Sequence, residues 1–295
     1  MKKKLLISFS GGRTSAYMTW WMQNIWKHRG EYEMIVVFAN TGREREETLQ
    51  FVNQCDRYYG FKTIWVEAVV NPENNKGTTH KIVNFQTANR TGQPFEDMIA
   101  KYGIPNQNAP HCSRDLKKQP IKSYARELGW RKYETALGIR TDEPKRLDWE
   151  SKKKNKFLYL AELIPTTKSD INLFWSKQPF DLNLKSYEGN CDLCWKKGLR
   201  KLMTIVKDKP EFADWWREMD EKYSMFTPET KMNKAAAPYR FFRDNMTIDD
   251  IIEESKFDFT PSRDESKDID MWKQQAMWDE YLDSNSGCSE SCEVF

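Results

Sequence analysis

The stretch Lys3-Lys-Leu-Leu-Ile-Ser8-Phe9-Ser10-Gly11-Gly12-Arg13-Thr14-Ser15 decides the fold of this chain. Its apolar first half predicts a short buried strand, because a brief apolar run that ends in turn residues suits a strand better than a helix. The glycine pair after it marks a tight turn. Between residues 16 and 28 the apolar side chains recur at helical spacing. The chain therefore opens with a strand, a glycine-rich turn and a helix.

The same alternation continues further along the chain. Residues 34–39 predict a second buried strand, residues 44–59 a helix, and residues 63–66 a third strand. Strands separated by helices predict a parallel sheet with crossover helices. The expected fold class is α/β, with a Rossmann-like parallel sheet, flanking helices and a helical C-terminal part.

Beyond residue 70 the predicted elements are fewer. Residues 71–79 and 139–155 predict loops, residues 119–128 a helix and residues 134–138 a further strand. From residue 199 the pattern is helical, with predicted helices at 199–206, 210–223 and 247–254, the last capped by Thr247. The predicted organisation is a nucleotide-binding domain with a cysteine cluster at 1–200, a helical part at 201–283 and a polar tail at 284–295.

Charge is distributed unevenly along the 295 residues, whose net charge is +3. Residues 244–295 hold 15 acidic and 4 basic side chains, so the preceding part carries +14. Such a body suits a polyanionic partner, a nucleotide or a nucleic acid; a solvated basic surface is the alternative. No apolar run approaches the ~20 residues of a membrane span, and none suits a signal peptide. We expect a cytoplasmic protein with no membrane partner.

The glycine-rich turn has the features of a phosphate-binding loop. Gly11 and Gly12 allow several backbone N–H groups to point at one anion. The helix that follows adds its N-terminal dipole, and Ser10 and Ser15 add hydroxyl groups. No Gly-Lys-Ser follows, so this is not the usual nucleoside-triphosphatase loop.

Five motifs in chain order resemble those of the adenine nucleotide α-hydrolase superfamily, which includes the N-type ATP pyrophosphatases and the phosphoadenosine phosphosulfate (PAPS) reductases. They are Ser10-Gly-Gly-Arg-Thr-Ser15, Thr41-Gly42 with the later Glu47-Thr48, Lys101-Tyr-Gly-Ile-Pro105, Cys112-Ser-Arg-Asp-Leu-Lys117-Lys-Gln-Pro120, and Gly138-Ile-Arg140-Thr-Asp-Glu143-Pro-Lys-Arg146. The resemblance covers about residues 3–200 and implies a pyrophosphate-binding (PP) loop. The nucleotide-binding residues that it implies are Ser8, Ser10, Gly11, Gly12, Arg13, Thr14, Ser15, Thr41, Gly42, Lys117, Gly138, Arg140 and Arg146.

Several of these residues also have a physical reason to bind an anion. Thr41 and Gly42 follow the second strand, at the carboxyl edge where parallel sheets bind ligands. Arg140 and Arg146 can clamp phosphate or sulfate in fork geometry; ion pairs with neighbouring carboxylates are the alternative. Lys117 is a further phosphate contact or a solvated helix lysine.

Thr14 departs from the pattern of the ATP-using members. Many ATP pyrophosphatases have an aspartate there that helps to hold Mg²⁺. We expect Mg²⁺ only if ATP is the substrate, and the threonine leaves room for nucleotides with no pyrophosphate to expel, such as adenylyl sulfate.

Three cysteines and a histidine form a candidate metal site. Cys191-x-x-Cys194 follows Cys112 after 79 residues, and His111 precedes Cys112. Adenylyl-sulfate reductases resemble this arrangement, with a Cys-Cys pair, a later Cys-x-x-Cys and a 4Fe–4S cluster. One imidazole and three thiolates suit such a cluster, and they also suit structural zinc; a site without metal is the third possibility.

The polar tail contains Cys288 and Cys292, in a position that resembles the nucleophilic cysteine of sulfonucleotide reductases. The resemblance implies attack of such a thiol on the sulfur of PAPS or adenylyl sulfate, followed by a thiol reductant such as thioredoxin. The alternative is an ATP-dependent adenylating sulfurtransferase that acts on nucleic acid, of the DNA phosphorothioation or tRNA thiolation type. A non-catalytic nucleotide-binding protein is the second alternative.

Overall fold

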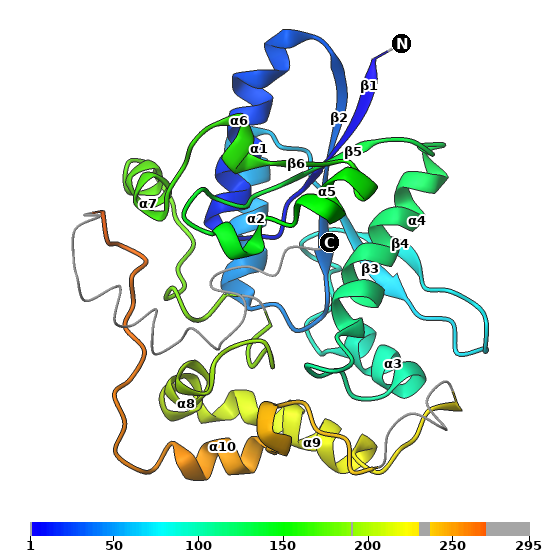
Figure 1. Cartoon of the computed structure of the whole chain (residues 1–295), viewed down its shortest axis with the longest axis vertical. Helices are drawn as coiled ribbons and strands as arrows, with labels where there is room; N and C mark the ends of the chain where they lie inside the picture. Colours follow the sequence, from blue (N-terminus) through cyan, green and yellow to red (C-terminus); the bar gives the residue numbers. More distant parts are fainter. Residues whose placement is uncertain (1, 190, 230–236, 270–295) are drawn as a thin grey trace.

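The computed structural model describes residues 2–189, 191–229 and 237–269. Six strands form one sheet in the order β4-β3-β2-β1-β5-β6 (Figure 1). β1 lies at its centre, with Leu5 opposite Met34 of β2 and Glu134 of β5. All neighbouring pairs are parallel except β3 and β4. The strands are β1 (Lys3–Ser8), β2 (Tyr32–Asn40), β3 (Ile64–Val69), β4 (Thr79–Val83), β5 (Glu134–Leu137) and β6 (Phe157–Tyr159).

Helices cover both faces of the sheet (Figure 1). They are α1 (Arg13–Asn24), η1 (Trp26–Arg29), α2 (Glu46–Tyr59), α3 (Gln93–Tyr102), η2 (Ser113–Lys118), α4 (Gln119–Glu127), η3 (Pro144–Arg146), α5 (Trp149–Asn155), α6 (Leu160–Leu163), α7 (Lys168–Ser176), α8 (Leu199–Asp208), η4 (Pro210–Phe212), α9 (Ala213–Tyr223), η6 (Arg243–Asn245) and α10 (Ile248–Glu254).

Successive side chains of β1 pack into two different hydrophobic cores. Ile7 packs with apolar side chains of α1, α2 and α7. Leu6 packs on the opposite face with side chains of α4. This alternation is what a strand buried on both faces requires, since successive side chains point to opposite sides.

The helices α8, α9 and α10 form a separate layer with α3 (Figure 1). Trp216 of α9 is fully buried and contacts Phe95 of α3 and Phe241, with ring centroids 5.8 and 4.9 Å apart. The same core includes Cys191 and Cys194. The helical C-terminal part therefore packs directly on the cysteine region.

The predicted strand–helix–strand–helix–strand order is confirmed, and so are the predicted elements at 119–128, 134–138 and 247–254. Thr247 caps α10, since its hydroxyl accepts the N–H of Asp250. The predicted loop 71–79 is confirmed up to residue 78, whereas the strand β4, which begins at Thr79, is not predicted, because its largely exposed side chains give no apolar signal. One prediction is wrong. The predicted loop 139–155 contains α5, a lysine-rich helix that Asp148 caps by accepting the N–H of Ser151.

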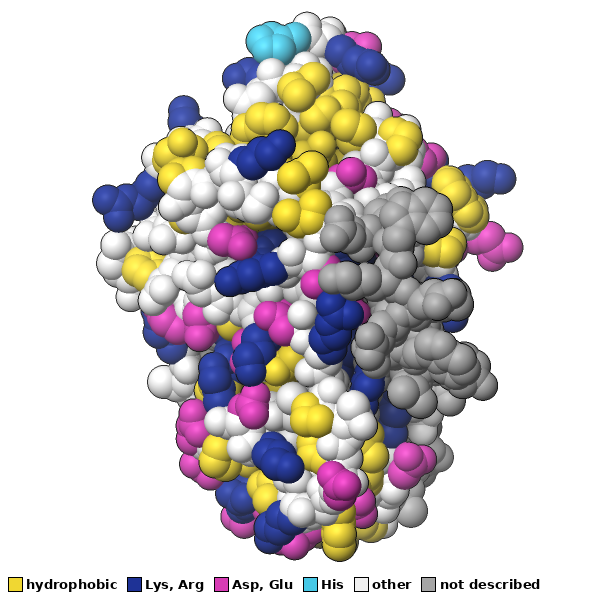
Figure 2. All heavy atoms as spheres, turned by 90° about the vertical axis from the view of Figure 1, so that its left-hand side faces the viewer, with side chains coloured by type: hydrophobic (Ala, Val, Ile, Leu, Met, Phe, Trp, Pro, Cys, Tyr) yellow, Lys and Arg dark blue, Asp and Glu magenta, His cyan; other side chains and the backbone are white. Residues whose placement is uncertain are grey.

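Figure 2 shows the molecule turned by 90° from the view of Figure 1. On this face, basic and acidic side chains alternate across the middle. Apolar side chains gather toward its upper end. Tyr17 and Trp20 of α1 contact Phe174 of α7, with ring centroids 5.0 and 4.8 Å apart. None of the helices in the described ranges is long and apolar enough to cross a bilayer.

Candidate nucleotide site and cysteine cavity

The PP-loop joins β1 to α1 and is closed by its own serines. The Ser15 hydroxyl donates to the Gly12 carbonyl at 3.0 Å and accepts the N–H of Ser10 at 3.2 Å. The Ser10 hydroxyl lies 2.9 Å from the Ser15 hydroxyl. Because the Ser15 proton is used on Gly12, Ser10 donates in this pair. Backbone N–H groups, rather than hydroxyls, are therefore the donors left for an anion.

Gly11 and Gly138 are required by the close approach of neighbouring segments. Gly11 has φ +82°, and a Cβ there would lie 2.6 Å from the Thr48 methyl group. A Cβ on Gly138, which follows β5, would lie 3.0 Å from the Ser15 Cα. The structure thus brings two of the predicted motifs together around the first turn of α1. Ser8, also predicted, is buried at the end of β1.

Within the described part of the chain, the N-terminus of α1 is a helix start without a side-chain cap. The first amides of any helix have no intrahelical partner and carry the positive end of its dipole. Such helix N-termini are the places where proteins commonly bind anions.

Arg13 uses its guanidinium within the fold. Its Nε and Nη2 donate to the two carboxylate oxygens of Asp181 at 2.6 and 2.7 Å, and Nη2 also donates to the Leu182 carbonyl. The Trp175 indole donates to the Arg13 carbonyl at 3.1 Å. Arg13 therefore anchors the loop to the segment after α7.

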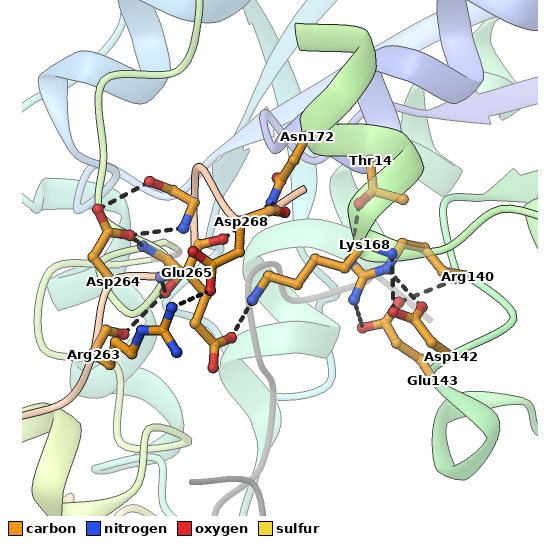
Figure 3. A network of polar contacts seen from close by, with 12 residues as sticks. Thr14, Arg140, Asp142, Glu143, Lys168, Asn172, Arg263, Asp264, Glu265 and Asp268 are labelled. Carbon is orange, nitrogen blue, oxygen red and sulfur yellow. Dashed lines mark hydrogen bonds and ion pairs between the residues drawn. The ribbon is translucent and has the colours of Figure 1, made fainter. Parts of the chain in front are cut away.

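Arg140 connects the glycine-initiated loop after β5 to the PP-loop (Figure 3). Its guanidinium is only 5% exposed, donates to the Thr14 hydroxyl at 3.2 Å and pairs with Asp142 at 2.8 Å. Thr14 thus contacts a guanidinium group. Many of the ATP pyrophosphatases that this chain resembles have an aspartate at this position. The contact brings one positive charge to the N-terminal turn of α1.

Arg146 reaches the same network through Glu143, with which it forms a close ion pair. Burial alone raises the pKa of the Glu143 carboxyl, but the guanidinium groups of Arg140 and Arg146 outweigh it and hold that pKa below its usual value. The carboxylate is therefore ionised, and it fixes both arginines beside the loop.

Lys168 extends this network toward the C-terminal segment (Figure 3). Its backbone N–H donates to Asp142 at 2.9 Å, and its ammonium group donates to Glu265 at 2.5 Å. Asn172 donates to the carbonyls of Glu265 and Asp268. The chain after α10 is thus attached to the nucleotide side of the molecule.

The three predicted cysteines line one cavity. Cys112, Cys191 and Cys194 surround about 20 Å³, which is room for about one water molecule. Thr41 also lines it, with its hydroxyl 3.4 Å from the Cys191 sulfur. The cysteine cavity therefore adjoins the carboxyl end of β2. Gly42 instead packs against Asn89, whose oxygen would lie 2.6 Å from a Cβ on that glycine.

Buried charges surround Cys191. Lys117 lines the cavity and pairs with Glu44 at 3.3 Å, both side chains being less than a tenth exposed. Burial raises the pKa of the Cys191 thiol well above its usual value; Glu44 and Cys194 raise it further, and Lys117 only partly offsets them. Lys197 donates to the Cys191 carbonyl at 3.0 Å. This arrangement favours the neutral thiol form of Cys191 over the thiolate.

The donor types of the cavity suit a soft metal. Within the described ranges, no group of three or more His, Cys, Asp and Glu side chains converges as metal ligands. His111 is not among the described residues that line the cavity, and its Nε2 donates to the Gly103 carbonyl at 2.9 Å. The 4Fe–4S cluster and the zinc alternative remain predictions. Cys288 and Cys292 lie outside the described residues.

Comparison with known proteins identifies the family of this chain. The family model of the phosphoadenosine phosphosulfate reductase domain matches residues 4–156, which span β1 to α5. The chain belongs to this family. An uncharacterized nin region protein, ORF290, of Escherichia phage lambda is 33% identical over 98% of this chain and 94% of its own length. The uncharacterized protein MJ0066 of Methanocaldococcus jannaschii is 29% identical over 46% of this chain, which spans about a quarter of that protein's length. No solved structure gives a significant match.

Membership of the PAPS reductase domain family makes this chain a member of a nucleotide-binding PP-loop family. Two residues of the site were not among those predicted. Glu44 lies inside the Thr41–Thr48 motif, and its place between two arginines was a usable signal. Asp181, the partner of Arg13, has no local signal, because it lies 168 residues further along the chain.

Proposed function

We propose that the chain binds an adenine nucleotide at the PP-loop and reduces a sulfonucleotide, PAPS or adenylyl sulfate. One observation carries the proposal: the uncapped first turn of α1 and the buried Arg140 meet at Thr14. Amides and a guanidinium are the donors that bind phosphate or sulfate groups.

The reaction requires a nucleophilic thiol, which we assign to Cys292 or Cys288. The thiolate attacks the sulfur of the bound sulfonucleotide, the sulfur–oxygen bond to the nucleotide phosphate breaks, and the nucleotide leaves with that electron pair. The cysteine then carries an S-sulfonate. A thiol reductant such as thioredoxin attacks the cysteine sulfur, forms a mixed disulfide and releases sulfite. Cys191 is a weaker candidate for this role because burial raises the pKa of its thiol and so disfavours the thiolate.

Calorimetry tests the nucleotide assignment. PAPS, adenylyl sulfate and ATP with Mg²⁺ are titrated into anaerobically purified protein. We expect a sulfonucleotide to bind at least tenfold more tightly than ATP, a difference of about 1.4 kcal/mol. Tighter binding of Mg–ATP contradicts the reductase assignment.

A second candidate is the adenylating sulfurtransferase that acts on nucleic acid. The observation that favours it is the cavity shared by Cys112, Cys191 and Cys194 beside Thr41, because several thiols next to a nucleotide site suit sulfur delivery. A Cys288→Ser/Cys292→Ser variant separates the two. A reductase loses sulfite release, whereas an adenylating enzyme still forms pyrophosphate from ATP.

A further inference from the structure

A serine, a histidine and a glutamate meet where the edge strand β4 packs against α4 (Figure 1). The Ser123 hydroxyl of α4 lies 2.9 Å from Nδ1 of His80, a residue of β4. The other ring nitrogen of His80, Nε2, lies 3.4 Å from a carboxylate oxygen of Glu127. A hydroxyl within hydrogen-bond reach of an imidazole that a third group orients is the arrangement of an activated nucleophile.

The spacing along α4 explains how one imidazole reaches both partners. Ser123 and Glu127 are four residues apart, so their side chains lie one above the other on the same face of the helix. The His80 ring spans the turn between them. The Tyr124 ring meets the His80 ring edge-on, with centroids 5.6 Å apart and an interplanar angle of 77°. Three contacts therefore hold the imidazole in position.

The neighbours of His80 also determine which of its ring nitrogens carries the proton. A carboxylate beside Nε2 favours the tautomer with the proton on that nitrogen. Nδ1 is then the acceptor, and the Ser123 hydroxyl donates to it. The His80 side chain is only 6% exposed, so little water competes for this hydrogen bond. The pair is thus arranged for transfer of the Ser123 proton to His80.

The proposed nucleophile borders an open space. Ser123 lines a cleft of about 420 Å³, a volume within the range of small-molecule sites. Gln119, one helical turn before Ser123, lines the same cleft. Its carboxamide is a donor of the kind that stabilises an oxyanion. The cleft therefore offers a nucleophile together with a donor for the negative charge that forms during its attack.

The cleft also carries a positive charge from Arg126, which lies three residues after Ser123. The Arg126 side chain is exposed, and its Nε donates to the Lys122 carbonyl at 3.2 Å. Asp115, a carboxylate in the cleft wall, is paired with Arg114 at 2.8 Å. A substrate with a negative group is therefore attracted to the Arg126 side of the cleft.

We propose that Ser123 and His80 form a second catalytic site, with Glu127 as its positioning residue, which hydrolyses small carboxylic esters that carry a negative charge. Ser123 is the nucleophile, His80 is the general base, and Arg126 selects the charge of the substrate. The proposal goes beyond the chemistry at the PP-loop and does not depend on it.

The reaction has two steps, and water is its co-reactant. The Ser123 oxygen attacks the ester carbonyl carbon, its proton passes to Nδ1 of His80, and the bond to the alcohol oxygen breaks. The alcohol leaves with the electron pair of that bond and takes the proton from His80. Water then attacks the acyl carbon and gives a proton to His80. The Ser123 oxygen leaves, recovers this proton and releases the carboxylic acid.

A fluorophosphonate probe tests the nucleophile on the full chain. An activated serine displaces fluoride from phosphorus and keeps the phosphonyl group, and peptide mass spectrometry locates the adduct. We expect the adduct at Ser123. Ser123→Ala should abolish it, whereas Ser176→Ala, which removes an exposed hydroxyl of α7, should keep it. His80→Asn should slow the labelling at least about 100-fold, and His28→Asn, at an exposed position of η1, should not change its rate.

Two esters of similar size test the substrate class: 4-nitrophenyl butyrate, which is neutral, and the 4-nitrophenyl monoester of succinic acid, which is anionic. Arg126→Gln should raise the KM of the anionic ester about 5-fold and leave that of the neutral ester unchanged. The control Lys122→Gln removes a charge of α4 that is not among the described residues of the cleft wall, and it should change neither KM. Glu127→Gln should lower kcat and leave KM unchanged, because it acts through His80.

Three results overturn the proposed site. They are no adduct at Ser123, an unchanged labelling rate in His80→Asn, and ester turnover that survives in Ser123→Ala. A hydrogen bond that only ties β4 to α4 would give the first of them. An equal effect of Arg126→Gln on both esters overturns the substrate class. Urea unfolding reports whether each variant is folded. If PAPS and ATP fail to bind but Ser123 is labelled as described, only the proposed function fails.

Discussion

Replacing Gly11 by alanine is the sharpest test of the PP-loop geometry. The new Cβ faces two costs. The backbone has φ +82°, a region that costs an L-residue about 1–2 kcal/mol. The Cβ would also lie 2.6 Å from the Thr48 methyl group and 3.1 Å from the Phe38 ring. Crowding of this kind in a packed core costs about 1–3 kcal/mol. We expect Gly11→Ala to lower the free energy of unfolding by about 2–5 kcal/mol.

Gly30→Ala is the matched control. Gly30 has φ +70°, and no atom lies within 4 Å of a Cβ placed there. This variant should therefore lose only the free energy of the unfavourable backbone conformation, about 1–2 kcal/mol. The difference between the two variants isolates the crowding against Thr48 and Phe38.

Urea unfolding of both variants measures these free energies, and calorimetry with the best-binding nucleotide measures the function of the loop. We expect Gly11→Ala to lose at least tenfold in nucleotide affinity and Gly30→Ala to lose none. Equal destabilisation by the two substitutions, or unchanged nucleotide affinity in Gly11→Ala, would refute the reasoning.

Three further predictions concern the surroundings of the loop. In a double-mutant cycle, Arg13→Ala and Asp181→Ala should show a coupling of about 1–3 kcal/mol in the free energy of unfolding. Purely additive effects would show that the ion pair between Arg13 and Asp181 does not stabilise the fold. Because the folded pKa of Glu143 lies below its usual value of about 4.5, its carboxylate stabilises the fold above that pH, and this contribution is lost as the pH falls through the folded pKa. Glu143→Gln should therefore lower the free energy of unfolding more at pH 6 than at pH 3, which the midpoints of urea unfolding measure. An equal loss of stability at both pH values would exclude the ion pairs as the cause. If the cysteine cavity binds a metal, Cys191→Ala should lose the iron or zinc found by elemental analysis of anaerobically purified protein, while Cys55→Ala, in the sheet core, should keep it.

The central part of the fold was predictable from the sequence because its signals are local. The apolar run before Ser8 and the helical spacing after Gly12 each depend on neighbouring residues only. Edge elements lack such signals. Thr79–Val83 pairs with β3 through its backbone while most of its side chains stay exposed, so hydrophobic periodicity cannot reveal it.

The candidate site was predictable as a set of motifs, and less so as a set of contacts. The motif spacing placed Cys112, Cys191 and Cys194 together, and the structure brings them to one cavity. The same reasoning made Arg13 a nucleotide contact, which stays a prediction, and it gave no indication that the Arg13 guanidinium binds Asp181. Which of two anions an arginine side chain binds depends on residues distant in sequence, and a local motif does not contain that information.

The anchor of Arg13 also bears on how the protein is made. Synthesis proceeds from the N-terminus, so the PP-loop leaves the ribosome long before Asp181 and Trp175, which hold its first helical turn. Contacts across such a separation close late in folding. A nascent chain that ends at residue 156, the last residue matched by the family model, already contains every strand-end glycine of the site but none of the groups that hold Arg13. The first turn of α1 is thus anchored only when the second half of the polypeptide has been made.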